Sequence, residues 1–95
     1  MQVKVQYLGL IRSKLGKKED ETNLKAGASL SELLDKLVEI YGESLKALFD
    51  VETENILDPT FIVTVNGVLA NQLHGMETKL SDGDSIALMT LIRGG

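Results

Sequence analysis

The amino-acid sequence predicts one α+β domain, in which a mixed sheet of four to five strands carries one main helix on one face. Three observations lead to this fold class. Apolar and polar residues alternate near the start of the chain, as they do in half-buried strands. Residues 29–41 instead repeat their apolar positions with helical spacing. The last apolar run, beginning at Ser85, follows a turn and is apolar enough to be a buried strand.

The composition fits one small globular domain over residues 1–95 and argues against several functions. The net charge is −4, whereas nucleic-acid-binding domains usually carry a basic stripe. The chain has no cysteine, which excludes disulfides, thiolate nucleophiles and iron–sulfur clusters. No apolar run approaches the ~20 residues that span a membrane. We therefore expect a cytoplasmic protein that binds neither nucleic acid nor a membrane.

The first strand is expected over residues 2–8, where apolar and polar residues alternate. Leu8 breaks this alternation, because it is apolar but belongs to the solvent-facing side of the strand. A short helical turn is expected next, over residues 9–16. Residues 17–25 are charged, and a second strand within them, antiparallel to the first, would lie at a sheet edge.

The main helix has signals at both ends. Ser29 and Glu32 form the capping-box pattern that begins a helix, and Gly42 is placed to end it. A second short helix is expected from Ser44. The apolar stripe of the main helix, which we expect to face the core, consists of Leu30, Leu33, Leu34, Leu37, Val38 and Tyr41.

The second half of the chain is expected to form strands joined by tight turns. Residues 61–65 are rich in β-branched side chains and predict a strand. Asn66-Gly67 predicts a two-residue hairpin turn of type I′, and a return strand starts at residues 68–69. Residues 70–78 are expected to be irregular. Asp82-Gly83 predicts the turn before the final strand.

The order and polarity of these elements predict how the sheet is arranged. The final strand is among the most apolar segments, so it should be central and parallel to the first strand, which gives a β-grasp sheet. A contiguous apolar patch on the face opposite the helix would mark a binding surface, unless a loop covers the strand. If Ile86 and Leu88 face the helix, the residues of that patch are Leu8, Ala87, Met89 and Leu91, with Leu69 placed to join them.

The sequence shows no constellation for catalysis or for a metal. His74 is the only histidine, and no cysteine or second histidine is present to complete a metal site. We therefore expect His74 in a solvated loop. No nucleophile motif stands beside a base, which argues against a hydrolase that works alone.

The last three residues are Arg93, Gly94 and Gly95, behind an apolar run. Glycine has no Cβ and tolerates nearly any backbone dihedral angles. We therefore expect residues 93–95 to form a flexible arm that threads a narrow cleft and presents its carboxylate inside another protein. Arg93 is placed to pair with acids that line such a cleft.

With these residues in place, the chain resembles the MoaD/ThiS family of ubiquitin-like sulfur carriers, and most closely the small subunit of molybdopterin synthase. The resemblance covers nearly the whole chain. It rests on residues 3–9, 11–12 and 16 at the opening, 29–33 at the helix start, 65–67 at the hairpin turn, 80–88 around the last turn and strand, and 94–95 at the end.

The resemblance implies a carrier that is not itself an enzyme. An ATP-dependent adenylating enzyme of the MoeB/ThiF type, similar to ubiquitin-activating enzymes, would convert the Gly95 carboxylate to an acyl-adenylate. A sulfur donor would then give a thiocarboxylate. No cofactor would be bound stably, because the partner would use the ATP and the sulfur would be covalent at the C-terminus.

The same resemblance implies how the carrier meets its partners. The arm would enter the large subunit of molybdopterin synthase and deliver sulfur for molybdenum cofactor biosynthesis. The resemblance implies Leu8, Leu69 and Met89 as partner-binding residues. We expect Leu91 and Ile92, next to the arm residues Arg93 and Gly94, to bind the partner as well.

Two alternatives stay open. Thr90 and Leu91 stand where many synthase small subunits carry two prolines, and the ending over residues 91–95 looks more like that of ubiquitin. A ubiquitin-like protein modifier would use the same activated carboxyl to form an isopeptide bond with a lysine. A plain interaction domain with an incidental Gly-Gly ending is the second alternative.

Overall fold

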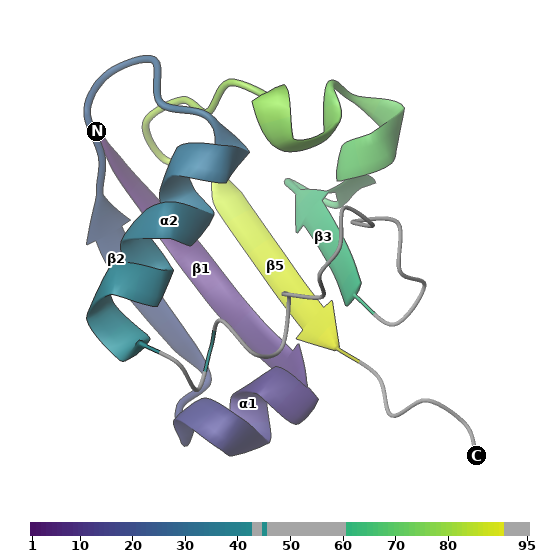
Figure 1. The fold of residues 1–95 in the computed structure, drawn as a ribbon. Helices are drawn as coiled ribbons and strands as arrows, with labels where there is room; N and C mark the ends of the chain where they lie inside the picture. Colours follow the sequence, from purple (N-terminus) through teal and green to yellow (C-terminus); the bar gives the residue numbers. More distant parts are fainter. Residues whose placement is uncertain (43–44, 46–60, 91–95) are drawn as a thin grey trace.

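A computed structural model of the chain describes residues 1–42, 45 and 61–90. Figure 1 shows a sheet with the helix α2 lying across one face. In chain order the elements are β1 (Gln2–Gly9), α1 (Leu10–Leu15), β2 (Glu19–Asn23), α2 (Leu30–Tyr41), β3 (Phe61–Val65), β4 (Val68–Leu69), the 3-10 helices η1 (Ala70–Gln72) and η2 (Gly75–Glu77), and β5 (Ser85–Thr90).

The five strands lie in the order β2-β1-β5-β3-β4. β1 and β5 are parallel neighbours, whereas the pairs β1–β2, β3–β5 and β3–β4 are antiparallel. The final strand is therefore central and parallel to the first, as predicted. A mixed five-stranded sheet with one main helix confirms the predicted α+β fold class of β-grasp type (Figure 1).

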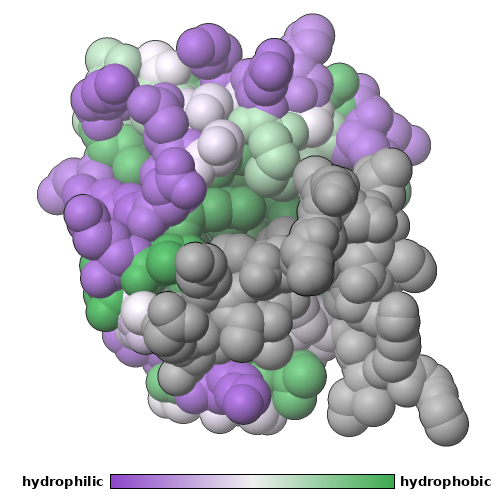
Figure 2. Space-filling view, viewed as in Figure 1, coloured by the Kyte–Doolittle hydropathy of each residue, from purple (hydrophilic) through white to green (hydrophobic). Residues whose placement is uncertain are grey.

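The hydrophobic core lies between α2 and the sheet. Ile86 and Leu88 of β5 are fully buried, so this side of β5 faces the helix as predicted. Burying an aliphatic side chain of this size contributes on the order of 1.5–3 kcal/mol. Viewed from the α2 side, hydrophilic residues lie over much of the upper and left parts of the surface, and an apolar area lies in its middle (Figure 2). The residues that β1 and α2 add to this core are Val3, Val5, Tyr7, Leu30, Leu33, Leu34 and Leu37.

The ends of α2 are fixed by the residues that the sequence indicates. The Ser29 hydroxyl accepts the backbone N–H of Glu32 at 3.3 Å, and the Glu32 carboxylate accepts the backbone N–H of Ser29 at 2.9 Å. This reciprocal pair satisfies two backbone donors that the first helical turn cannot. At the other end, the Gly42 N–H donates to the carbonyl of Val38 at 2.7 Å.

The hairpin turn between β3 and β4 is tied to the start of β5. Asn66 and Gly67 both have positive φ, at 53° and 85°, as a type I′ turn requires. The Asn66 side chain accepts the Ser85 N–H at 2.9 Å and donates to the Asp84 carboxylate at 3.0 Å. The turn residues therefore help to place β5 as well as β3.

The turn at Asp82-Gly83 ties β5 to β1. The Asp82 carboxylate accepts the Gln2 N–H at 2.8 Å, and the Gly83 N–H donates to the Gln2 carbonyl at 2.8 Å. The Lys4 N–H donates to the Asp84 carbonyl at 2.9 Å. The turn therefore helps to fix the register between β1 and β5.

Several boundaries differ from the sequence-based expectations. β1 runs one residue further than predicted, to Gly9, because the pairing with β5 continues to that residue. The stretch 70–78 is not irregular but contains η1 and η2, and Ala70 is buried. Of the short helix expected from Ser44, only Leu45 is among the described residues, where it is helical and buried.

Within the described ranges, no helix is both long enough and apolar enough to cross a membrane.

Candidate functional site

Cross-strand pairing gathers apolar residues on the open face of the sheet, which is the face opposite α2. Leu8 pairs with Met89, and Met89 pairs with Ile62. Directly paired residues project from the same face of a sheet, so these three residues form a row across β1, β5 and β3. Leu8 is 36% exposed, and Met89 and Ile62 are half-buried.

A second row lies beside the first. Ala87 pairs with Thr64, and Thr64 pairs with Leu69 at the β4 edge. Leu69 is 42% exposed. Residues two apart along a strand share a face, so the two rows make one continuous surface. Its apolar members, which we call the open-face patch, are Leu8, Ile62, Leu69, Ala87 and Met89.

The open face becomes polar away from this patch, toward β2 and the start of β1. The patch lies where the parallel strands β1 and β5 both end. Thr90 is the last described residue at that end, so the patch borders the point from which the chain leads to residues 91–95. The polar residues that the register places on the other part of the face are Lys4, Gln6, Glu19, Glu21 and Ser85.

Three of the predicted partner-binding residues, Leu8, Leu69 and Met89, are thus brought to one face. Their part in binding stays a prediction. The same holds for the predicted residues outside the described ranges, which are Leu91, Ile92, Arg93, Gly94 and Gly95.

Ile62 belongs to the same surface, although the sequence analysis did not single it out. The signal was present in the alternation of residues 61–65. Val63 and Val65 are buried against the core, so Ile62 must project from the other face of β3. A strand with a single polar residue, Thr64, hides this alternation, because its two faces look nearly alike in the sequence.

The helix-facing side of β5 ends in an unusual buried residue. Thr90 is 4% exposed, and its hydroxyl oxygen finds no hydrogen-bond partner in the part of the chain that the structure describes. Buried polar groups normally have partners. The end of β5 is therefore held by backbone pairing and packing, without a hydrogen bond from this side chain to those residues.

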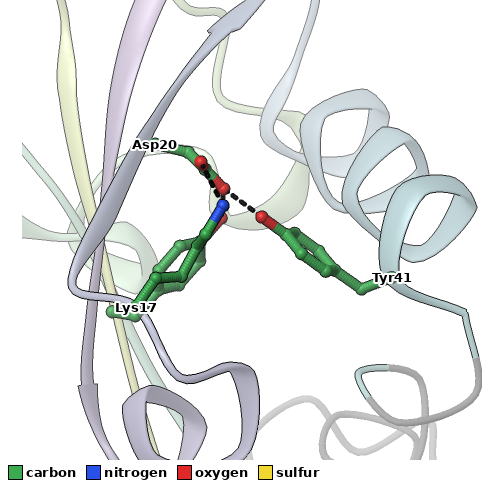
Figure 3. A network of polar contacts seen from close by, with 4 residues as sticks. Lys17, Asp20 and Tyr41 are labelled. Carbon is green, nitrogen blue, oxygen red and sulfur yellow. Dashed lines mark hydrogen bonds and ion pairs between the residues drawn. The ribbon is translucent and has the colours of Figure 1, made fainter.

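A polar cluster lies on the helix side of the sheet, away from the open-face patch. Figure 3 shows Lys17 and Tyr41 converging on the carboxylate of Asp20. Lys17 Nζ lies 3.0 Å from Asp20 Oδ1. The hydroxyls of Tyr41 and Tyr7 both donate to Asp20 Oδ2, the second at 2.9 Å. The cluster joins the end of α2 to β2 and β1, so its role is to hold elements together.

The pKa values in this cluster follow from these contacts. Burial raises the pKa of the Asp20 carboxyl, but the hydrogen bonds from Tyr41, Lys17 and Tyr7 outweigh burial and lower that pKa overall. Burial, followed by the bond to Asp20, raises the pKa of the Tyr7 hydroxyl far above its ordinary value. Both pKa shifts favour the states that the two groups already have at neutral pH, where Asp20 is ionised and Tyr7 is protonated.

The single histidine lies apart from both groups of residues. His74 is exposed between η1 and η2, as predicted for a solvated loop. In residues 1–42, 45 and 61–90, no group of three or more His, Cys, Asp or Glu side chains is placed to hold a metal ion.

Comparison with known proteins agrees with this fold. The model of the ThiS family matches residues 5–95. The chain belongs to the ThiS family. A search among curated proteins gave no significant match. ThiS-family and MoaD-like proteins are small carriers and not catalysts themselves, and this ThiS-family chain has their ubiquitin-like sulfur-carrier fold.

Solved structures give the same fold for this ThiS-family chain. Small archaeal modifier protein 1 from Methanosarcina acetivorans is 26% identical, with 99% of this chain and 96% of that chain covered and a TM-score of 0.78. Urm1 from Trypanosoma brucei is 24% identical, with 99% and 95% covered and a TM-score of 0.80. A putative molybdopterin converting factor subunit 1 from Pyrococcus furiosus is 23% identical, with 97% and 99% covered and a TM-score of 0.73. The likeness to the last two shows the fold alone.

Proposed function

We propose that this protein is a sulfur carrier whose Gly95 carboxylate is activated by adenylation and converted to a thiocarboxylate. The observation that carries the proposal is the ThiS-family match, which runs to residue 95 and so includes the Gly94-Gly95 ending. A carboxylate is a poor electrophile, so activation must precede sulfur transfer. The chain supplies the group that is modified, and its partners supply catalysis.

The first step consumes ATP on an adenylating enzyme. A carboxylate oxygen of Gly95 attacks the α-phosphorus of ATP, the bond to the bridging oxygen breaks, and pyrophosphate leaves. In the second step a hydrosulfide ion attacks the acyl carbon and AMP leaves with the bridging oxygen. The hydrosulfide proton passes to solvent, and nothing is oxidised or reduced. The protein needs no stably bound cofactor, because the ATP belongs to the partner and the sulfur is covalent.

We propose the open-face patch as the surface on which the adenylating enzyme and the sulfur-accepting partner bind. An exposed, contiguous apolar patch on a small protein usually marks an interaction site. The patch borders the end of β5, and each residue after Thr90 extends the chain by at most about 3.5 Å. A partner seated on the patch therefore has Gly95 within reach. We propose that Leu91 and Ile92 extend this contact, and that Arg93 and Gly94 lie inside the partner's cleft.

For the sulfur acceptor, we propose a molybdopterin precursor. This chain then acts as the small subunit of molybdopterin synthase, with the large subunit as its second partner. This choice follows the resemblance of the sequence to the small subunit of molybdopterin synthase, and the fold shared with the putative molybdopterin converting factor subunit 1 from Pyrococcus furiosus is compatible with it. Because the activation requires ATP, we propose the cytoplasm as the location.

A second candidate is a ubiquitin-like modifier. The ending Arg93-Gly94-Gly95 and the 26% identity with small archaeal modifier protein 1 from Methanosarcina acetivorans favour it. In this case a lysine amine attacks the activated Gly95 carbonyl, AMP leaves, and an isopeptide bond forms. Both candidates share the adenylation step.

The proposal is tested by reconstitution. The chain is incubated with the adenylating enzyme from its own genome, ATP and hydrosulfide, and its intact mass is followed. We expect an ATP-dependent exchange of one oxygen for sulfur, which a variant lacking Gly95 does not show. An unchanged mass in the complete mixture contradicts the proposal.

The same reaction then separates the two candidates. Loss of the added sulfur when the synthase large subunit and the pterin precursor are supplied supports the molybdopterin role. Retention of the sulfur, together with Gly-Gly remnants on lysines of proteins in a lysate of the source cells, supports the modifier and contradicts the pterin acceptor.

A further inference from the structure

Gly9 has a backbone conformation that other residues avoid. It is the last residue of β1 and stands directly before α1, with φ 68° and ψ −139°. These angles mirror those of the extended polyproline II conformation. Glycine adopts the mirrored region freely, whereas a residue with an L side chain is strained there by about 1–3 kcal/mol.

Gly9 also lies against the backbone of the last described residue of β5. The two residues, Gly9 and Thr90, are partners in the parallel β1–β5 ladder. A Cβ added at Gly9 would come far closer to the carbonyl oxygen of Thr90 than the 3.0 Å limit for real Cβ atoms. It would also lie 3.3 Å from the Thr90 carbonyl carbon. A backbone group within a sheet cannot rotate aside as a flexible side chain can, so the end of β5 would have to move on the order of an ångström.

No hydrogen bond from the Thr90 side chain resists such a movement in the described part of the chain. Its hydroxyl is buried but has no partner among those residues. The position of the end of β5 therefore depends on backbone pairing with β1 and β3, at Gly9 and Phe61. Of these two partners, Gly9 is the one whose missing side chain leaves room for the Thr90 carbonyl.

We propose that Gly9 is a positioning residue for the terminal carboxyl. Because Gly9 has no side chain, the end of β5 can lie directly against the end of β1, and this sets the point from which residues 91–95 extend toward a partner's active centre. The inference rests on the proposed function, since it concerns the delivery of Gly95 for adenylation. When a partner's cleft holds residues 91–95 extended, a shift at their start is passed on to the Gly95 carboxylate. A misplacement of about 1 Å at the reacting group can reduce a rate by about 100-fold, so this contact has a measurable consequence.

Gly42 provides a matched control within the same chain. Its dihedral angles, φ 72° and ψ −148°, are close to those of Gly9. Among the described residues, a Cβ added at Gly42 would meet nothing within 4 Å. Gly9→Ala and Gly42→Ala therefore introduce similar backbone strain, and only the first pushes against the end of β5.

The experiment measures pyrophosphate release by the adenylating enzyme, with ATP in excess and the carrier concentration varied. For Gly9→Ala we expect kcat to fall about 10-fold or more relative to Gly42→Ala, while KM for the carrier changes less than about twofold. A purely structural role would lower the fraction of folded protein and leave the kcat of the folded part unchanged. Urea unfolding measures the folded fraction of each variant, and kcat is calculated per folded molecule.

A second variant keeps the test decisive if Gly9→Ala does not fold. A glycine inserted after Thr90 leaves the sheet unchanged but shifts the terminal segment by up to about 3.5 Å, and we expect kcat to fall here too. Equal kcat for Gly9→Ala and Gly42→Ala, or an unchanged kcat for the insertion, overturns the inference alone. Failure of the wild-type chain to be adenylated overturns the proposed function and the inference together.

Discussion

At the scale of single residues, one carboxylate joins three elements. Asp20 accepts hydrogen bonds from Tyr7, Tyr41 and Lys17. Asp20→Asn removes the charge from this acceptor, and hydrogen bonds to charged groups contribute about 1.5–3 kcal/mol. The site is partly exposed, so we expect a loss of about 1–2 kcal/mol in the free energy of unfolding at neutral pH. Urea denaturation measures the loss, and Asp35→Asn on the exposed face of α2 serves as the control.

The pKa of the Asp20 carboxyl also sets how the free energy of unfolding depends on pH. The pKa of Asp20 is lower in the folded protein than its ordinary value of 3.8. Its contribution is therefore fully present above that value and is lost as the pH falls through the folded pKa. The stability gap between the wild type and Asp20→Asn should narrow in acid. A gap that stays constant from neutral pH to well below 3.8 contradicts this assignment.

The buried hydroxyl of Thr90 marks a position where a substitution should stabilise the folded protein. Thr90 is 4% exposed, and its hydroxyl has no partner within the described residues. An unsatisfied buried hydroxyl costs about 1–3 kcal/mol, so Thr90→Val should raise the free energy of unfolding by about 1 kcal/mol. The control is Thr78→Val. Thr78 is equally buried, but its hydroxyl donates to the Gly75 carbonyl at 2.7 Å and accepts the His74 N–H at 3.0 Å.

The two threonines should respond in opposite directions to the same chemical change. Urea unfolding should show a gain for Thr90→Val and a loss for Thr78→Val. A loss of similar size at both positions would mean that the Thr90 hydroxyl is satisfied in solution.

At the scale of elements, α2 depends on its first turn. Ser29→Ala removes the side chain that accepts the Glu32 N–H, and loss of such a cap costs about 1 kcal/mol. Ser31→Ala, two residues later on an exposed position of α2, should change stability by less than about 0.5 kcal/mol. Thermal unfolding followed by circular dichroism compares the two, and equal melting temperatures would show that the capping box contributes nothing.

The elements with local signals were predictable from the sequence. The capping box at Ser29 and the Asn66-Gly67 turn act through neighbouring residues, so the sequence alone contains their cause. The segment 70–78 was not predictable, because its single helical turns carry no periodic apolar pattern. Ile62 was missed because every residue around it in β3 except Thr64 is apolar, which conceals which face is buried.

At the scale of the whole molecule, the fold places an apolar surface and the end of β5 side by side. Leu8→Asp puts a charge in the open-face patch. A charge buried against a partner without a counter-charge is costly, so we expect affinity for the adenylating enzyme to fall about 10-fold or more. Ile40→Asp is the matched control, because Ile40 is an aliphatic residue of α2 that is 57% exposed. Titration calorimetry distinguishes them, and equal affinities would place the binding surface elsewhere.

The features of the whole molecule that the sequence did not predict depend on contacts between residues far apart in the chain. The order of the elements predicted the central pairing of the first and last strands, and with it the shared face of Leu8 and Met89. The Asp20 cluster joins residues 13 and 21 positions apart, and no local pattern indicates such contacts. The close approach of Gly9 to Thr90 is likewise invisible until the strands are paired.

The proposed function depends on the chemical state of one terminal group. The most direct measurement is the mass of the C-terminal peptide of this protein after purification from the cells that make it. We predict a fraction in which sulfur replaces one oxygen of the Gly95 carboxylate. A terminal glycine that is always an ordinary carboxylate, even after incubation with the adenylating enzyme, ATP and hydrosulfide, would contradict the assignment as a sulfur carrier.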